Sequence, residues 1–483
     1  MKHLSYIKIK IFLFSLFFIF CFMFMTTSLQ ILSSDYGVYY ANAMFLDKNY
    51  SLYSDAFDHK GPVFYIFIKL IGLLFGWGGY STFIPLFFSF FIFLLSFLFF
   101  LETLRLNKYK IFILSVASIA CIFDQSGNGS MSFFVNSLIL LYLSYLIKFI
   151  DSKKFYYFII SAIFLTLAIL TRIDAIIFSI LIIFHLFLFP KTFQERFLSL
   201  VVIFFAFTII FNIVSTYFDF SIDKYIKTNF IFNFLYPSKV DAHYLSHFHK
   251  PESLKILFAS GIGVLLFILL NEFLPKMKKF SKRIYGKSRE EKFFLSLITS
   301  VIFFVVFLIP KTEQSHYVLN LSVSSLILSA ILINFIDFKK VLVIPLFAIF
   351  FYSILTHTLL PTIKFFKTFG CIESLSCPSF SSIKDTMQDV SNYQNAIIIY
   401  GNGWINIFSD TAPALSISNW PIFEENQIGN YFRTITDSNK FLVKKDQILW
   451  VDKAIYKKFE KYVGKSNYKI ISAQKSYFKI EIN

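Results

Sequence analysis

Long runs of Phe, Leu and Ile recur along the chain, and short segments that carry most of its charged residues separate them. Such runs have the length at which a helix crosses the ~30 Å hydrocarbon layer of a bilayer. A shorter apolar piece, residues 62–77, leads into a glycine-rich turn with no basic residue. The pattern predicts membrane spans up to about residue 32 and at 82–101, 111–124, 131–150, 156–171, 174–190, 197–217, 254–272, 293–310, 317–336 and 341–361.

Basic residues occur in every second loop between these spans, which is the distribution that the positive-inside bias produces. The alternation holds only if residues 62–77 do not cross the membrane and instead rest in the outer leaflet or dip back. We therefore expect a polytopic α-helical membrane protein with about 11 transmembrane helices plus one partly embedded helix, and a cytoplasmic N-terminus. The segments expected on the outer face are 33–62, 124–130, 172–174, 217–252 and 311–316.

The composition is 56% hydrophobic, 21% aromatic and 16% charged, which excludes an ordinary soluble globular protein. The net charge of +17 could indicate a nucleic-acid partner. Because the basic residues gather in short loops between spans, we expect membrane lipid and no nucleic acid. The first apolar run is too long for a signal peptide, so we expect it to be an uncleaved transmembrane helix. Together with the later spans it predicts a multi-pass protein of the inner or plasma membrane.

Polar residues dominate after about residue 362. Residues 396–400, 448–451 and 468–473 are typical of strands, and residues 454–463 have helical spacing. We expect two domains, a transmembrane domain over 1–361 and a small α/β domain over 362–483. An odd number of crossings places the second domain outside the cell, where Cys371 and Cys377 could form a disulfide; the sequence leaves this pairing open.

The outer segment 33–62 concentrates ionisable residues at the membrane edge, where they are costly to hold. A carboxylate at Asp35, directly after the first span, could deprotonate an acceptor hydroxyl or amine. Lys60 precedes a helix with Pro62 in its first turn, so a phosphate there would meet backbone N–H groups and a cation. The alternative roles are a helix-end aspartate and an interfacial lysine directed at anionic lipid. Further candidates in this segment are Asp58 as a catalytic acid and Tyr53, Asp55 and His59 as substrate ligands.

Other polar residues are expected on the same face. Arg172, which is close to Asp174, is either a second anion ligand or part of a local ion pair in a turn. Asp124 is a candidate second acid in a glycine-rich turn. Near the start of the predicted span at 317–336, we expect Glu313 to be a substrate ligand and His316 and Tyr317 to be donor-phosphate ligands. Although Glu313 and His316 have helical i, i+3 spacing, no recognised metal motif is present; we name no metal ligand and leave a divalent metal open as a cofactor.

The pattern resembles the GT-C superfamily of membrane glycosyltransferases, in particular the dolichyl-phosphate-mannose/aminoarabinose-transferase-like group. The residues that carry the resemblance are Asp35 after the first span, Tyr53-Ser-Asp55, Lys60-Gly-Pro62 and, more weakly, His316-Tyr317 at the start of a late span. The resemblance implies a GT-C-like fold, Asp35 as catalytic base and Lys60 as a donor-phosphate ligand. It also implies a polyprenyl-phosphate-sugar donor and an acceptor on the outer face.

We therefore expect an enzyme, a hexosyl- or pentosyltransferase that moves a sugar from a lipid-phosphate carrier to a lipid, glycan or protein acceptor. A flippase or transporter of lipid-linked polysaccharide is the alternative, and a polysaccharide polymerase lies between the two. Transport requires charges along a path through the membrane. Here the acids gather at one face and most spans are free of charge, which favours chemistry at the interface.

Overall fold

The structure is a computed structural model, and it divides the chain into two compact units. The first comprises residues 1–27, 86–211 and 241–365, and the second comprises residues 28–85, 212–240 and 366–483. The residues that the structure describes are 2–28, 34–48, 51–53, 58, 60–123, 130–188, 192–232, 263, 265–266, 269–270, 287–308, 315–335, 384–392, 397–399, 446, 448–453, 456–474 and 476–483. The predicted domain boundary at residue 361/362 lies outside them.

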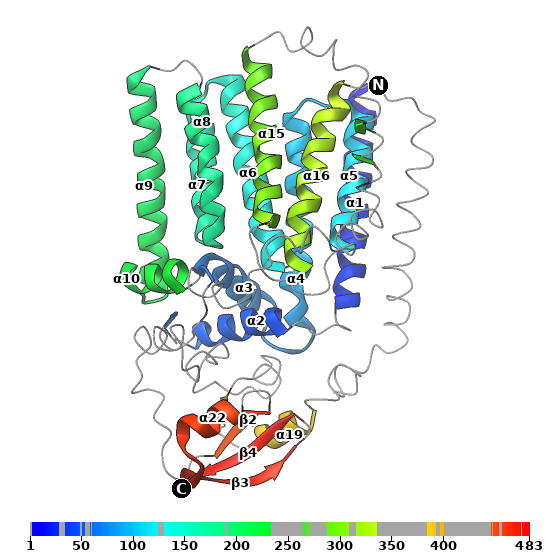
Figure 1. The fold of residues 1–483 in the computed structure, drawn as a ribbon. Coiled ribbons are helices and arrows are strands. Elements are labelled where there is room, and N and C mark those ends of the chain that lie inside the picture. Colours follow the sequence, from blue (N-terminus) through cyan, green and yellow to red (C-terminus); the bar gives the residue numbers. More distant parts are fainter. Residues whose placement is uncertain are drawn as a thin grey trace. The chain divides into compact units, whose positions relative to one another are not determined.

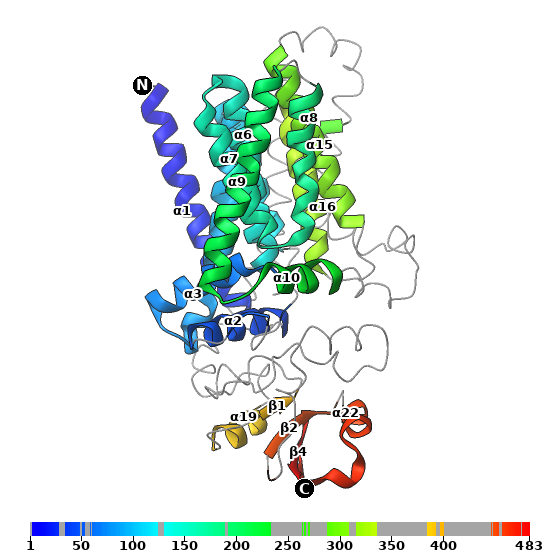
Figure 2. The ribbon, with the colours of Figure 1, turned by 90° about the vertical axis from the view of Figure 1, so that its left-hand side faces the viewer.

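The first unit is a bundle of apolar helices that run side by side (Figures 1 and 2). Phe and Leu side chains fill its interior, and the tightest pairs are α6 with α7 and α15 with α16. Its helices are α1 (Lys2–Ser28), α4 (Ile84–Thr103), α5 (Lys108–Phe123), α6 (Ser130–Ser152), α7 (Phe155–Ile169), α8 (Ile180–Leu188), α9 (Phe193–Tyr217), α15 (Lys287–Leu308) and α16 (Ser315–Phe335), with the 3₁₀ helix η2 (Ile173–Ser179) before α8.

These helices lie where the sequence predicts spans. Within the described ranges, three helices are long and apolar enough to cross a membrane: Ser81–Thr103, Met131–Ser152 and Phe193–Tyr217. Shorter apolar helices occupy the predicted spans at 156–171, 174–190, 293–310 and 317–336. Helices α1 and α5 occupy the first predicted span and the one at 111–124. The predicted span at 341–361 lies outside the described residues and the one at 254–272 lies largely outside them, so the number of crossings stays a prediction.

Helices α1 and α4 are antiparallel neighbours. Lys10 Nζ lies 2.6 Å from Glu102 Oε1, which joins the start of α1 to the end of α4. The Phe18 and Phe87 rings, 5.1 Å apart, join the later part of α1 to the start of α4. The chain therefore leaves and re-enters the bundle at the same end, in agreement with the expectation that residues 62–77 make no crossing.

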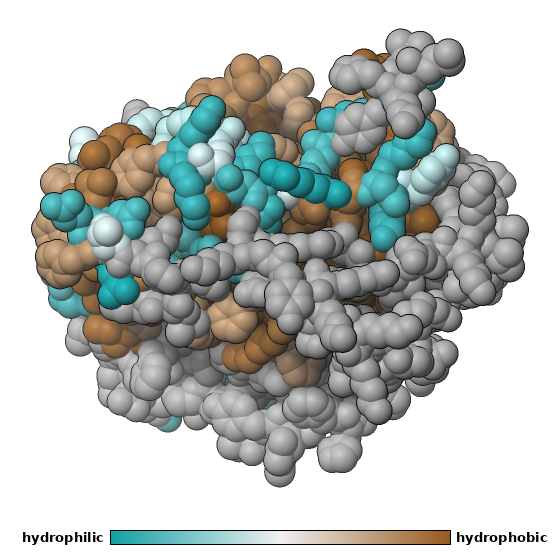
Figure 3. All heavy atoms as spheres, turned by 90° about the horizontal axis from the view of Figure 1, so that it is seen from above, coloured by the Kyte–Doolittle hydropathy of each residue, from teal (hydrophilic) through white to brown (hydrophobic). Residues whose placement is uncertain are grey.

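The basic loops of the bundle meet at one end, which we call the basic end. Arg105, after α4, pairs with Asp151 near the end of α6 at 3.1 Å, and Lys292 near the start of α15 pairs with the same carboxylate. Lys148 lies 4.0 Å from the centre of the Phe99 ring. Figure 3, viewed onto this end, shows hydrophilic side chains gathered among apolar ones. The sequence predicted this common end; its cytoplasmic location stays a prediction.

The second unit contains two packed helices: one lies in the segment 33–62, which was expected to be a loop, and the other matches the short apolar helix expected at 62–77. The elements are α2 (Ser34–Asp47), α3 (Pro62–Phe75), the 3₁₀ helix η1 (Gly79–Phe83), α10 (Ile222–Tyr225) and the π-helical segment η3 (Ile226–Phe232). The expectation of a loop was wrong for residues 34–47. Residues from Tyr36 to Leu46 are apolar on almost every side and nearly all buried, so no polar face marks them as an amphipathic helix.

Trp77, which follows α3, packs against both helices of the α2–α3 pair. Its indole Nε1 donates to Asp47 Oδ2 at 2.9 Å, and its ring lies against Tyr40 at 5.3 Å. Lys69 of α3 donates to the carbonyl of Leu46 at 3.1 Å. A Cβ atom placed on Gly72 would lie only 2.5 Å from the Trp77 ring, so the indole packs here because residue 72 has no side chain.

Gly72→Val is therefore expected to destabilise the protein by about 1–3 kcal/mol, the usual cost of overpacking, because the rigid indole cannot move without losing its bond to Asp47. Thermal unfolding of the purified protein in detergent measures the effect as a lower Tm. Leu74→Ala is the matched control on the same helix, since Leu74 is 77% exposed. A Gly72→Val protein with the Tm of the control would show that Trp77 is not held against α3.

The C-terminal part of the second unit contains a four-stranded sheet in the order β1-β2-β4-β3. β1 pairs in parallel with β2, and the other pairs are antiparallel. The elements are β1 (Ile397–Ile399), β2 (Ile448–Asp452), β3 (Tyr468–Ala473), β4 (Tyr477–Ile482), α19 (Lys384–Ser391) and α22 (Tyr456–Val463). The three predicted strands and the predicted helix are confirmed, and β4, which lies between two of them, was missed.

Candidate functional site

Helices α2 and α3 run in the same direction. Near their starts, the Tyr39 and Phe64 rings meet edge to face at 5.8 Å, and farther along Lys69 of α3 reaches Leu46 of α2. Their N-termini therefore lie at the same end of the pair. Asp35 is the second residue of α2, and Lys60 comes two residues before α3. Parallel packing thus brings to one end two positions that are separated in the chain by helix α2 and the segment after it.

The backbone at Lys60 is held by Tyr53. The Tyr53 hydroxyl donates to the Lys60 carbonyl at 2.9 Å. Tyr53 is 1% exposed and has a φ of 67°, a left-handed conformation that is uncommon for a residue with a side chain. Burial raises the pKa of Tyr53 well above its usual range, so the hydroxyl keeps its proton and remains a donor. Tyr53 thus supports the backbone of Lys60 from a buried position, and its predicted role as a substrate ligand stays a prediction.

Asp58 fixes the other side of the same loop. Its Oδ2 accepts a hydrogen bond from the Tyr65 hydroxyl on α3 at 2.5 Å, and both side chains are almost completely buried. These contacts tie the loop before α3 to the first turns of that helix. The hydrogen bond from Tyr65 positions the backbone at Asp58, and the catalytic role of Asp58 stays a prediction.

Tyr65→Phe removes the hydroxyl whose hydrogen bond Asp58 accepts. A buried carboxylate that loses a donor is expected to cost about 1–3 kcal/mol of stability. The measurement is thermal unfolding in detergent, and Tyr109→Phe on α5 is the control because Tyr109 is 62% exposed. Equal Tm values for the two variants would show that the bond does not hold the loop.

The start of α3 has the properties of an anion site. Gly61 caps the helix in an extended conformation and offers no side-chain bond to the first turn, and Pro62 is the first residue. The backbone N–H groups and the positive end of the helix dipole at such a terminus favour a negative charge. Lys60, immediately before the cap, adds a full positive charge, and together these groups suit a phosphate.

Aromatic residues that follow α9 pack against this loop. The Leu52 N–H donates to the Phe218 carbonyl at 3.2 Å. The Tyr53 ring lies 5.1 Å from Phe220 and 6.3 Å from Tyr225. The sequence predicted an aromatic surface segment over 217–252, and it did not predict this contact with the loop before α3.

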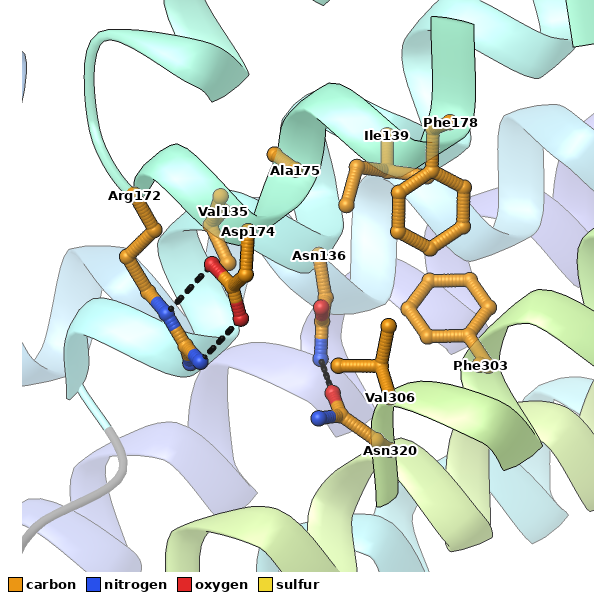
Figure 4. A pocket seen from close by; sticks show the side chains of 10 residues that line it. All are labelled: Val135, Asn136, Ile139, Arg172, Asp174, Ala175, Phe178, Phe303, Val306 and Asn320. Atoms are coloured by element: carbon orange, nitrogen blue, oxygen red, sulfur yellow. Dashed lines mark hydrogen bonds and ion pairs between the residues drawn. The ribbon is translucent and has the colours of Figure 1, made fainter. Parts of the chain in front are cut away.

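A second polar site lies in the first unit, between α6, η2, α15 and α16 (Figure 4). Arg172 Nε and Nη2 donate to the two carboxylate oxygens of Asp174, the first at 3.1 Å, and Nη1 donates to Ser132 at 3.0 Å. Asn136 of α6 and Asn320 of α16 face one another, with 3.4 Å between Nδ2 and Oδ1. The sequence signal for the two asparagines was present, since each is an amide inside an apolar span.

The remaining predicted site residues are placed less completely. Asp55, His59, Asp124 and Glu313 lie outside the described residues. His316 and Tyr317 belong to the first turn of α16, and Asp35 to that of α2; for these three the structure describes the backbone. Lys60 belongs to the second unit and Arg172 to the first, so each site is described by itself.

No family model matches the chain, and no curated protein matches its sequence. Solved structures match its fold. ArnT from Cupriavidus metallidurans bound to undecaprenyl phosphate has a TM-score of 0.60 and 10% identity, over 96% of this chain and 97% of that one. The apo state of that ArnT has a TM-score of 0.55 and 11% identity, with the same coverage. The Archaeoglobus fulgidus oligosaccharyltransferase, in complex with Zn and sulfate, has a TM-score of 0.52 and 13% identity, over 96% of this chain and 73% of that one.

Proposed function

The chain has the GT-C fold of integral membrane glycosyltransferases, and from this premise we propose that it transfers a sugar from a polyprenyl-phosphate donor to an acceptor at the outer membrane face. Asp35 is the proposed base and Lys60 the proposed donor-phosphate ligand. The N-terminus and the basic end would face the cytoplasm, and residues 362–483 would lie outside.

One observation carries the proposal: the parallel packing of α2 and α3. It places an acid position and a cation position at the same end of two helices, whose positive dipole ends point the same way. A base and a leaving-group site are the two requirements of transfer from a phosphate carrier. Tyr53 and Asp58 support the proposal: Tyr53 bonds to the backbone of Lys60, and Asp58, two residues before Lys60, accepts a bond from Tyr65 of α3.

The proposed step is a displacement at the anomeric carbon. The acceptor oxygen or nitrogen forms a bond to C1 while the bond from C1 to the phosphate oxygen breaks, and Asp35 takes the proton of the acceptor. The polyprenyl phosphate leaves with the electron pair of the broken bond. Its growing negative charge is stabilised by Lys60 and by the N–H groups at the start of α3. Attack from the face opposite the phosphate inverts C1.

The similar structures bear on the class of donor. The ArnT structure contains undecaprenyl phosphate, a lipid phosphate of the kind proposed as leaving group here. A carrier anchored in the membrane reaches the start of α3 without leaving the bilayer. The predicted ligands Asp55, His59 and Glu313 for substrate, and His316 and Tyr317 for phosphate, remain part of the proposal, as does Asp124 as a second acid.

The test compares cells with and without this protein by mass spectrometry of their lipid-linked glycans and surface polysaccharide. Loss of a single sugar from the product, with accumulation of the lipid-linked donor, is expected for a transferase. Accumulation of a complete lipid-linked unit on the inner face would instead identify a flippase. Transfer by the purified protein in proteoliposomes, from a polyprenyl-phosphate sugar to the glycan so identified, completes the assignment.

A further inference from the structure

We propose that the pocket between Asn136, Asn320 and the Arg172–Asp174 pair binds a saccharide through its hydroxyl groups and does not bind phosphate. This inference rests on the proposed function, because it assigns a substrate class within a sugar transferase. It differs from the interpretation of Arg172 as a second anion ligand, and it agrees with the alternative of a local ion pair with Asp174.

Residues of four elements line the pocket. Val135, Asn136 and Ile139 come from α6, Phe303 and Val306 from α15, and Asn320 from α16; the other lining residues are Arg172, Asp174, Ala175 and Phe178. The space amounts to about 210 Å³, including its opening. This volume includes the open space at the mouth. The enclosed part has room for one water-sized group, so a single hydroxyl of a sugar can enter it while the ring stays at the mouth.

Two buried amides point to a polar ligand. Asn136 is 1% exposed and Asn320 is 2% exposed. Within the described part of the chain, Asn320 Nδ2 has no hydrogen-bond acceptor. A buried donor without a partner costs about 1–3 kcal/mol, so its retention inside an apolar helix calls for a ligand that accepts its hydrogen. Figure 4 shows this amide beside that of Asn136, within the pocket.

The charges of the pocket disfavour phosphate. The guanidinium of Arg172 is engaged by both oxygens of Asp174, and its remaining Nη1 donates to Ser132. The pair is neutral as a unit, and the Asp174 carboxylate, which is 40% exposed, would repel a phosphate at the mouth of the pocket. A neutral ligand meets no such penalty.

Saccharide hydroxyls match the groups that remain. Each hydroxyl donates one hydrogen bond and accepts others, and the pocket offers amide donors, amide acceptors and the free lone pairs of Asp174. The Phe178 and Phe303 rings lie on the side of the asparagines that faces away from Arg172 and Asp174 (Figure 4). Their centres are 4.8 Å apart, and they form an apolar wall for the C–H groups of a sugar ring. Apolar walls with a few convergent polar groups are typical of small-molecule sites.

The position in the bundle agrees with a substrate from the outer face. The pocket uses the first half of α6, the last half of α15 and the first half of α16. The basic end uses the end of α6 and the start of α15. The pocket therefore lies in the half of the bundle opposite the basic end. The sugar could come from the lipid-linked donor or from a glycan acceptor, and the test below separates these sources.

The test measures dissociation constants of the full-length protein in nanodiscs for three probes. These are undecaprenyl phosphate, a panel of undecaprenyl-phosphoryl monosaccharides, and lipid-free oligosaccharides. Wild-type protein is expected to bind at least one sugar-bearing probe about tenfold more tightly than its sugar-free counterpart, as one or two hydrogen bonds provide. Asn320→Leu is expected to lose this tenfold gain and to keep the wild-type affinity for undecaprenyl phosphate. Asn136→Leu is the second variant, should Asn320→Leu fail to fold.

Ser324→Ala is the matched control. Ser324 lies one turn beyond Asn320 on α16, where it bonds to Ser300 of α15 away from the pocket, and it should keep the tenfold gain. Loss of binding to the lipid-linked sugars in the asparagine variants assigns the pocket to the donor, and loss of binding to the lipid-free oligosaccharide assigns it to the acceptor.

Three results would overturn the proposal: an equal loss of affinity for undecaprenyl phosphate in the asparagine variants, an unchanged gain in them, or no gain for any sugar in the wild type. Wild-type protein that binds none of the lipids would contradict the proposed function, and the oligosaccharide probes would still decide this inference.

Discussion

Asp35→Asn is expected to lower the rate of sugar transfer by about 10²- to 10⁴-fold, the contribution of a positioned general base. Asparagine has nearly the same shape as aspartate and cannot take the proton of the acceptor. The substitution lies in the first turn of α2 and leaves the buried face from Tyr36 onward unchanged, so the fold should persist. The rate is measured with purified protein in proteoliposomes and the donor that mass spectrometry identifies.

Asp223→Asn provides the control for this experiment. Asp223 belongs to the same unit, and its carboxylate is 64% exposed in an i, i+4 pair with Lys227. Loss of an exposed pair of this kind costs little. A transfer rate that is the same in Asp35→Asn as in the wild type would remove the proposed base, whereas equal losses in both variants would indicate a general effect of charge.

Lys60→Ala is expected to have the second large effect, a loss of about 10²- to 10³-fold in kcat/KM for the donor. Lys60 would stabilise the charge that grows on the departing phosphate, and single groups of this kind contribute about that much. The hydrogen bond from Tyr53 ends on the Lys60 carbonyl, which alanine keeps. The loop should therefore retain its conformation, and the loss reports the charge of the side chain.

The control for Lys60 is Lys48→Ala. Lys48 is an exposed lysine at the opposite end of α2, in the same unit. It should leave the transfer rate unchanged, and Lys60→Ala should weaken binding of undecaprenyl phosphate as well as transfer. Undiminished affinity for undecaprenyl phosphate in Lys60→Ala would place the donor phosphate elsewhere. This outcome is independent of the pocket near Asn320, which we expect to act on the sugar.

The sequence by itself determined the described helices of the bundle and their common basic end. Hydrophobic length is a local property, because each span satisfies its own backbone hydrogen bonds in the bilayer. The positions of Lys and Arg in the loops then predict the direction of each helix. The pairing of Asp151 with Arg105 and Lys292 at one end of the bundle agrees with these directions. Strands β1, β2 and β3 were predictable for a similar reason, since β-branched and aromatic residues gather locally.

Only the tertiary structure decided how the polar residues combine. Helix α2 has no polar face, so the sequence did not reveal it. Where it packs against α3, Trp77 lies against Gly72. Asn136 and Asn320 meet although 184 positions separate them. Arg172 is held by Asp174 and Ser132. Such contacts depend on side-chain packing between distant segments, and packing is decided by the shapes of all the neighbours together, which no local pattern of residues records.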